Sequence, residues 1–468
     1  MMPSSHQVSQ LVSWATSHGA HLHPSLEVYQ DAQTGLSFRV SPDAAEGTKP
    51  FDAIVSLPTS LTLSYLNALP GSKNDPKPFP AEFLDQTPPH VIGRFVLIKH
   101  YLVGDESFWA PYVRALPQPG EVDSWSLPPF WPSDDAELLE GTNVEVGIQK
   151  TRANVQTEFE HACALLAEEQ WEPSLTSGLV LSLYQWAYSI FSSRSFRPSL
   201  VLPAADRESL PNGVGVDDFS VLLPLFDVGN HDMTEQVRWE LDEGRASCQL
   251  KVARAYKPGE QVFNNYSLKT NAELLLGYGF MIPETESLHN DYVHVRKRQA
   301  ASGPSAEEYY ISLRPIHYPS SLLARSKQTL QLSESTKVIG AFQHVQHDMV
   351  WDIFCTLVPS EHHSQLIPTD SNLQSDAAEQ ARLDAFFSGK VSGDAIMLLQ
   401  QTAAIIQHKV MQELERLDET DLEVVGEGDL TRNQQLALTY RAQCRRVLEN
   451  TLEAMEADEL LGQDDESG

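Results

Sequence analysis

The spacing of apolar residues predicts that the first half of the chain mixes helices with short strands. Apolar residues recur every three or four positions in four segments, residues 8–15, 91–102, 144–169 and 179–191. This spacing is typical of a helix with one buried face. Gly19 follows the first pattern and predicts the end of an opening helix. Residues 61–69 also have helix-forming sequence.

Short apolar runs between these helices predict strands. Four segments have the length and composition of strands, namely residues 53–58, 219–226, 237–241 and 248–253. The last two alternate apolar and polar residues on either side of a turn at residues 242–244, as in a β-hairpin. Residues 71–80 and 198–216 are interpreted as loops. Short strands, tight turns and inserted helices together predict an α+β fold.

The pattern becomes helical after residue 322. Long helical patterns cover residues 337–357, 377–387, 393–417 and 433–457. Residues 309–313 are compatible with one more strand before them. A chain of 468 residues is too long for one ordinary core, so we expect two or three domains.

Charge and cysteine content narrow the function classes. The net charge is −31, from 33 basic and 64 acidic residues. Such a charge repels nucleic acid and favours a basic protein partner, although solubility alone also explains it. The cysteines are far apart and form no CxxC pair, which argues against a zinc site or a disulfide framework: Cys163, Cys248, Cys355 and Cys444. No secretory signal and no apolar run of about 20 residues is found, so we expect a soluble, intracellular protein.

Polar residues of interest follow the apolar run at residues 219–226. Asp227, Asn230 and His231 come directly after it, where a ligand can reach side chains at the mouth of a buried strand. Tyr266 and Tyr278 follow on either side of a predicted short helix. Taken singly, Asn and His are common in turns, and tyrosine is common in packing. Their combination, in this order, indicates a functional site.

This combination resembles the SET-domain protein methyltransferases, in the class typified by the Rubisco large-subunit lysine methyltransferase. The matching residues are Asn230-His231, the Pro258-Gly259-Glu260 turn, Tyr266 and Tyr278-Gly279-Phe280. In weaker form the resemblance extends from about residue 8 to about residue 455. It includes a Trp109-x-x-Tyr112-x-x-x-Leu116-Pro117 signature and the segment Ser193-Arg194-Ser195-Phe196.

The resemblance implies a fold and its boundaries. We expect a SET-domain β-fold in which two segments cross as a pseudoknot, with an inserted helical region, followed by an all-helical C-terminal domain. The catalytic domain would cover residues 1–300, with the insertion at about 88–200. A Rubisco-methyltransferase-type substrate-binding domain would cover residues 301–460. Residues 461–468 would form an acidic tail.

The resemblance also implies site roles and S-adenosyl-L-methionine as the cofactor, with no metal. Tyr266 would be the catalytic residue. The cofactor would contact Thr34, Gly35, Leu36, Asn230, His231 and Tyr266. The substrate would contact Arg194, Phe196, Asp227 and Tyr278. Asp227 offers either a backbone carbonyl to the amine or a turn cap, and Arg194 lines the channel or forms a salt bridge at its rim. Ser37 replaces the second glycine of the family's cofactor loop.

The implied function is a protein-lysine N-methyltransferase acting on a non-histone protein, with a ribosomal protein or translation factor suggested by analogy. Methyl transfer needs a neutral amine aligned with the donor, so orientation and desolvation carry most of the catalysis. One alternative is a histidine acceptor, which the apolar ring of Phe196 disfavours because imidazole needs a polar partner. Another alternative is a catalytically inactive SET-fold adaptor. Ser37 favours this alternative, whereas Tyr266 disfavours it.

The expected partner is a protein substrate, with a basic one favoured. We expect no direct contact with nucleic acid or membrane, a monomer, and a cytoplasmic or nuclear location. The outer faces of the C-terminal helices are polar and acidic, which predicts that they dock a basic substrate.

Overall fold

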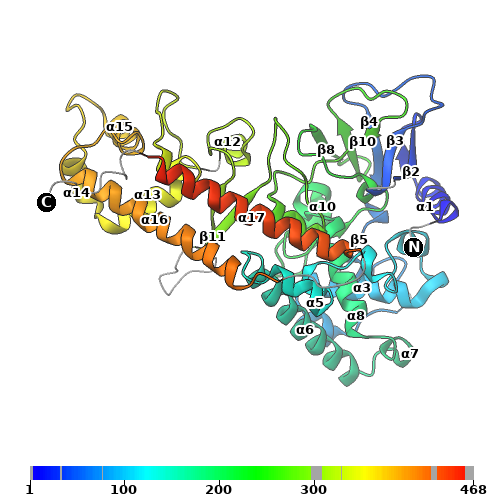
Figure 1. The fold of residues 1–468 in the computed structure, drawn as a ribbon. Coiled ribbons are helices and arrows are strands. Elements are labelled where there is room, and N and C mark those ends of the chain that lie inside the picture. The colour runs from blue at the N-terminus through cyan, green and yellow to red at the C-terminus, as the bar shows by residue number, and fades with distance from the viewer. Residues whose placement is uncertain are drawn as a thin grey trace. The chain divides into compact units, whose positions relative to one another are not determined.

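The computed structural model, drawn in Figure 1, forms two compact units, and each unit is built from three separate segments of the chain. The described residues are 4–458, without residues 32–33, 76, 297–307, 328 and 423–428, so the predicted tail at 461–468 lies outside them. The first unit combines Met1–Phe130, Gln149–Ser267 and Gly277–Gly279. The second combines Trp131–Ile148, Leu268–Leu276 and Phe280–Gly468. Each unit has its own buried apolar core.

Three small antiparallel sheets form the framework of the first unit. The strand orders are β1-β4-β9-β8, β10-β3-β2 and β5-β7-β6. Their bounds are β1 His21–Leu22, β2 Leu26–Asp31, β3 Gly35–Val40, β4 Ala53–Pro58, β5 Leu63–Ser64, β6 Ser195–Phe196, β7 Val221–Leu222, β8 Val237–Asp242, β9 Ser247–Val252 and β10 Gln261–Val262. The predicted hairpin is confirmed, because β8 and β9 pair in register with Trp239 opposite Leu250.

Helices complete the first unit. They are α1 Ser5–Ser17, α2 Ala81–Gln86, α3 Pro89–Val103, α4 Ala110–Ala115, α6 Glu145–Glu168, α7 Pro173–Thr176, α8 Leu181–Arg194, α9 Pro198–Val201 and α10 Ala204–Glu208. The first turn of α6 belongs to the second unit. Ser4 and Gln7 form a capping box at the start of α1, which fixes where this helix begins.

Three sequence-based assignments in the first unit are wrong. The strand predicted at residues 219–226 is limited to Val221–Leu222, because Pro224 has no N–H and Leu225 turns the chain with a φ of +71°. The segment predicted as helical at residues 61–69 is a short strand, Leu63–Ser64, between two 3₁₀ turns. The loop predicted at residues 198–216 contains the short helices α9 and α10.

Helix α3 is more deeply buried than its amphipathic pattern predicts. Val91, Phe95 and Ile98 are buried as expected, but so are Lys99 and His100. The Lys99 ammonium lies 2.6 Å from a carboxylate oxygen of Asp75, which compensates part of the cost of burying this charge. Burial lowers the pKa of Lys99, and the Asp75 carboxylate counteracts that change.

Two long antiparallel helices dominate the second unit (Figure 1). They are α16, Asp394–Glu419, and α17, Arg432–Glu456. Shorter helices pack around them, namely α5 Ser133–Ala136, α12 Leu322–Ser326, α13 His347–Leu357, α14 Ser360–Leu366 and α15 Ser375–Phe387. Helix α13 begins ten residues later than the predicted helix at 337–357, after a 3₁₀ turn at Gly340–Phe342. A two-stranded antiparallel sheet, β11 Tyr292–Arg296 and β12 Glu308–Ser312, belongs to the same unit.

The second unit includes a segment far earlier in the sequence. Asp135 Oδ2 accepts a hydrogen bond of 3.1 Å from Asn433, and Asn143 Oδ1 accepts one of 2.8 Å from Tyr440. Arg416 forms an ion pair of 2.8 Å with Glu145. The compact units therefore divide the chain differently from the predicted boundary at residue 300, and residues 131–148 belong with the C-terminal helices. The functional division into catalytic and substrate-binding domains stays a prediction.

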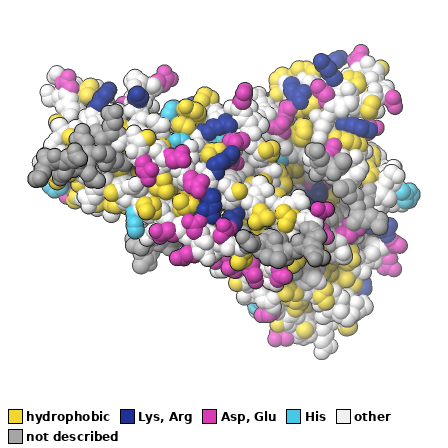
Figure 2. Space-filling view, in the orientation of Figure 1, with side chains coloured by type: hydrophobic (Ala, Val, Ile, Leu, Met, Phe, Trp, Pro, Cys, Tyr) yellow, Lys and Arg dark blue, Asp and Glu magenta, His cyan; other side chains and the backbone are white. Residues whose placement is uncertain are grey.

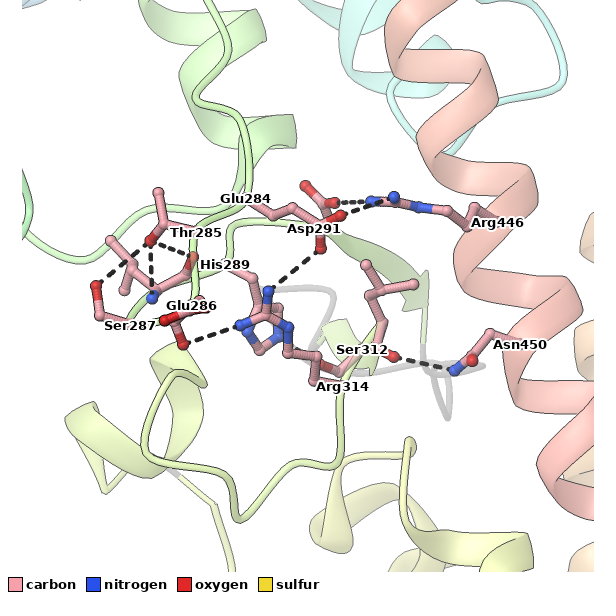
Figure 3. Close-up of polar contacts among 12 residues, drawn as sticks. Glu284, Thr285, Glu286, Ser287, His289, Asp291, Ser312, Arg314, Arg446 and Asn450 are labelled. Carbon is pink, nitrogen blue, oxygen red and sulfur yellow. Dashed lines mark hydrogen bonds and ion pairs between the residues drawn. The ribbon is translucent and has the colours of Figure 1, made fainter.

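A polar network ties a loop of the second unit to α17 (Figure 3). The guanidinium of Arg446 pairs with Glu284 at 2.8 Å and with Asp291 at 2.6 Å. Nearby, Asn450 donates a hydrogen bond of 3.0 Å to the carbonyl oxygen of Leu313. These contacts satisfy buried charge at one end of β12 and fix the chain that follows α11, Asn271–Tyr278.

No helix among the described residues is long and apolar enough to cross a membrane.

Candidate active site

The predicted site lies where two distant segments of the first unit cross. The amide of Asn264 donates a hydrogen bond of 2.7 Å to the carbonyl of Asn230, and the amide of Asp232 donates one of 3.0 Å to the carbonyl of Asn264. His231 and Asn264 form an isolated parallel β-bridge. A Cβ atom at Gly229 would stand 3.2 Å from the Cβ of Asn264, so glycine allows this close approach.

Tyr266 is fixed at this crossing by its backbone, its ring and its hydroxyl. Its amide donates a hydrogen bond of 3.0 Å to Nδ1 of His231. Its ring lies between those of His231 and Tyr278, with centroid distances of 4.8 Å and 5.2 Å and interplanar angles of 5° and 21°. The hydroxyl donates to the carbonyl oxygen of Gly229 over 2.8 Å. Burial raises the pKa of Tyr266, so the phenol stays neutral.

A strained turn precedes the crossing. Leu225 adopts a φ of +71°, which is rare for a side chain of this size and costs about 1–3 kcal/mol. Phe226–Val228 then form a single 3₁₀ turn. Arg194, at the end of α8, donates a hydrogen bond of 3.1 Å to the carbonyl oxygen of Asp227. The predicted substrate residues Arg194 and Asp227 therefore lie together.

The carboxylate of Asp227 is buried, and its pKa is therefore higher than that of an exposed aspartate. Burial raises its pKa from 3.8 to about 6, while the charge of Arg194 and a hydrogen bond from Tyr112 oppose the rise. The Tyr112 hydroxyl donates to Oδ2 of Asp227 over 2.8 Å. Sequence reasoning gave Tyr112 no role at the site. Only its membership of the Trp109-x-x-Tyr112 signature singled it out.

The loop predicted to bind the cofactor contacts the same crossing. Gly35 has a φ of +78°, and a Cβ atom there would have no neighbour within 4 Å among the described residues. Asn230 Nδ2 donates a hydrogen bond to the Ser37 hydroxyl and another of 3.3 Å to the Leu36 carbonyl. The open space at Gly35, next to this amide, fits the polar end of a ligand such as S-adenosylmethionine.

Ser37 explains how the loop accommodates a side chain where the family has glycine. The residue is fully buried, so its hydroxyl points into the protein. This hydroxyl lies 3.0 Å from that of Thr34 and donates a hydrogen bond of 3.2 Å to the Gly35 carbonyl. The serine therefore adds internal hydrogen bonds to the loop, and the open side at Gly35 is kept.

Phe196 lies in a different environment from the tyrosines. Its ring packs edge-on against Trp239 at 5.2 Å and against Phe226 at 6.1 Å between centroids. It is buried in β6, next to β7. Phe196 thus supports the strained turn from behind, through Phe226. The channel role predicted for it stays a prediction, as do the roles of the other site residues.

Comparison with known proteins supports the architecture. No protein-family model matches the chain. Over 303 residues it is 28% identical to the ribosomal lysine N-methyltransferase set10 of Schizosaccharomyces pombe, covering 63% of this chain and 50% of the relative. Over 313 residues it is 25% identical to the protein-lysine N-methyltransferase EFM1 of Saccharomyces cerevisiae, covering 58% of this chain and 49% of the relative. The chain thus spans about half the length of these curated relatives.

The structural match is more extensive. The SET domain of LSMT, solved with methyllysine and AdoHcy bound, superposes with a TM-score of 0.60 at 18% identity, covering 97% of this chain and 92% of the other. Rubisco LSMT bound to AdoMet superposes with a TM-score of 0.58, also at 18% identity, covering 97% of this chain and 92% of the other. The small sheets and the crossing at Asn230 and Asn264 define a SET-domain fold. In sequence and fold, the chain resembles the SET-domain proteins of the Rubisco LSMT-like class, as predicted. The predicted fold class is confirmed.

Proposed function

We propose that this protein is an S-adenosylmethionine-dependent protein-lysine N-methyltransferase acting on a non-histone protein. The observation that carries the proposal is the neutral, half-buried phenol of Tyr266, stacked on two aromatic rings and directed at the Gly229 carbonyl. The names of set10 and EFM1 and the fold support it.

The residues of the crossing have tasks that suit methyl transfer to an amine. S-adenosylmethionine, when bound, supplies an electrophilic methyl group on a sulfonium. Tyr266 brings a polar hydroxyl without a charge, so it aligns the acceptor and does not compete for the methyl group. The aromatic faces of Tyr266 and Tyr278 favour an approaching ammonium by about 0.5–2 kcal/mol. Burial of that amine then lowers its pKa and helps to release its proton.

The substrate we favour is a basic protein, such as a ribosomal protein or translation factor. Two relatives carry the names of a ribosomal lysine and a protein-lysine methyltransferase. The chain has a net charge of −31, and Figure 2 shows acidic side chains spread over the visible face, with Lys and Arg among them. This charge would speed the encounter with a basic protein, so KM for the protein substrate should rise with salt. The cytoplasmic or nuclear location and the monomeric state stay predictions.

A labelling experiment tests the proposed activity. The purified chain is incubated with methyl-labelled S-adenosylmethionine and a cell extract, and the labelled protein is mapped by mass spectrometry. We expect label on lysine with the wild-type chain and far slower labelling with Tyr266→Phe. Label on histidine would contradict the lysine acceptor and support the histidine alternative. A chain that binds the cofactor but labels no protein in any extract would favour the adaptor.

A further inference from the structure

The signature at residues 109–117 forms hydrogen bonds with distant parts of the first unit. The Trp109 indole donates a hydrogen bond of 3.0 Å to the carbonyl of Leu61. The carbonyl of Pro117 accepts one of 2.7 Å from the Trp186 indole. Both contacts are explained by packing. Tyr112, between them, makes the only contact of the three that reaches the candidate site.

Tyr112 and Arg194 hold Asp227 from two sides. The Tyr112 hydroxyl donates to the Asp227 carboxylate over 2.8 Å, and Arg194 donates to the Asp227 carbonyl over 3.1 Å. Tyr112 is 1% exposed and Asp227 is 8% exposed, so water competes little for these contacts. One contact holds the side chain and the other holds the backbone, which together fix the orientation of the residue.

The orientation of Asp227 matters because the turn it occupies carries the acceptor for Tyr266. Gly229, two residues on, accepts the Tyr266 hydroxyl. Leu225, two residues before, has an unfavourable φ of +71° that persists only when its surroundings impose it. Releasing Asp227 would let the turn relax and would move the Gly229 carbonyl away from Tyr266.

We propose that Tyr112 is a positioning residue for methyl transfer, which acts by holding the Asp227 carboxylate and thereby the turn that orients Tyr266. This inference rests on the proposed function. It gives Tyr112, the tyrosine of the Trp109-x-x-Tyr112 signature, a task in positioning the reacting groups, although Tyr112 does not touch substrate or cofactor.

The same contact sets the acid behaviour of the site. The titratable and charged groups that face Asp227 are Tyr112 from α4, Arg194 from α8 and Tyr266 after β10. The pKa of Asp227 is raised to about 6 by burial, and both Arg194 and the Tyr112 hydroxyl oppose this rise. Removing the hydroxyl therefore raises this pKa further. The ionised carboxylate accepts a stronger hydrogen bond from Tyr112 than the neutral acid does, so we expect log kcat to rise more steeply with pH below the pKa of Asp227 than above it.

Tyr112→Phe tests the inference, and Tyr184→Phe is its matched control. Tyr184 is also fully buried in the first unit, and its hydroxyl also donates to a carboxylate over 2.8 Å, namely that of Glu158. Melting curves and calorimetric binding of S-adenosylmethionine are measured first for both variants. Rates with saturating cofactor and the labelled protein substrate are then measured from pH 5 to pH 9.

For Tyr112→Phe we expect unchanged cofactor affinity and a fall in kcat of about 10- to 100-fold. The break, meaning the pH at which the slope of log kcat against pH changes, should lie at higher pH than in the wild type. Tyr184→Phe should keep kcat and the break while losing similar thermal stability. Equal kcat values in the two variants would overturn the inference. So would an unmoved break in Tyr112→Phe.

Asp227→Asn provides a second measurement should Tyr112→Phe fail to fold. Asn keeps an oxygen for Tyr112 but has no titrating group, so the break should disappear. A break that persists at the wild-type pH would overturn the inference. A wild-type chain that neither binds S-adenosylmethionine nor methylates protein would instead overturn the proposed function, so the two failures are distinguishable.

Discussion

Asn230 donates a hydrogen bond to the hydroxyl of Ser37, which connects the loop at Gly35 to the crossing of the two chain segments. The residue that replaces the family's glycine is thus part of the site's internal bonding. Its hydroxyl also contacts Thr34 and the Gly35 carbonyl, so one side chain links two residues of the loop to Asn230.

Ser37→Ala should weaken binding of S-adenosylmethionine. The Asn230 amide would keep the Leu36 carbonyl but lose its second acceptor, which should cost about 0.5–1.5 kcal/mol, or about two- to tenfold in Kd. Titration calorimetry measures this change. Ser9→Ala, on the exposed face of α1, is the control and should bind as the wild type does. Wild-type affinity in Ser37→Ala would contradict the role assigned to this hydroxyl.

Tyr266→Phe should fold and bind cofactor but lose most turnover. The variant keeps the stacked ring and loses only the hydroxyl, whose removal from a preorganised site typically costs about 10²–10³ in kcat. Single-turnover rates at saturating cofactor measure the effect. Tyr65→Phe, buried in the same unit, is the control. Turnover within about threefold of wild type, a difference below about 1 kcal/mol, would show that Tyr266 is not catalytic.

Asp227→Asn should make the protein more stable at neutral pH while it impairs activity. The pKa of Asp227 rises from 3.8 to about 6 on folding, so between these values the folded state keeps a proton that the unfolded state loses. The free energy of unfolding therefore falls as pH rises from about 4 to 6, and the penalty persists above this range. Asn removes the penalty, with an expected gain of about 1–3 kcal/mol at pH 7.5 and little at pH 4.

Urea unfolding of the wild type and Asp227→Asn at the two pH values checks this expectation. Asp43→Asn, on an exposed loop, is the control for a general effect of net charge. An equal difference in stability at pH 4 and pH 7.5 would mean that the Asp227 carboxylate is not the cause.

Truncation near Leu322 should give an aggregating fragment. Residues 131–148 would remain, but their partners Asn433, Tyr440 and Arg416 would be gone. The apolar side chains of this segment, including Trp131 and Leu139, would then face water. Light scattering and circular dichroism on the fragment measure the outcome. A monomeric, folded fragment would show that residues 131–148 do not depend on α16 and α17.

Sequence reasoning predicted the parts of this protein that local pattern determines. Alternation around Glu243 and Gly244 sufficed for the hairpin of β8 and β9, and apolar spacing sufficed for α16 and α17. The strand expected at residues 219–226 was wrong because its backbone is turned at Leu225 by contacts from elsewhere. The pairing of Tyr112 with Asp227 spans 115 residues and leaves no local signal.

The place of residues 131–148 also bears on how the chain is made. Tyr440 lies 297 residues after Asn143, with which it forms a hydrogen bond. During synthesis this early segment leaves the ribosome long before the helix that buries it. Its apolar side chains are therefore exposed until that helix has been made. Contacts of such sequence separation slow folding and prolong exposure to aggregation. We therefore expect that the nascent chain needs a chaperone until α17 has been synthesised.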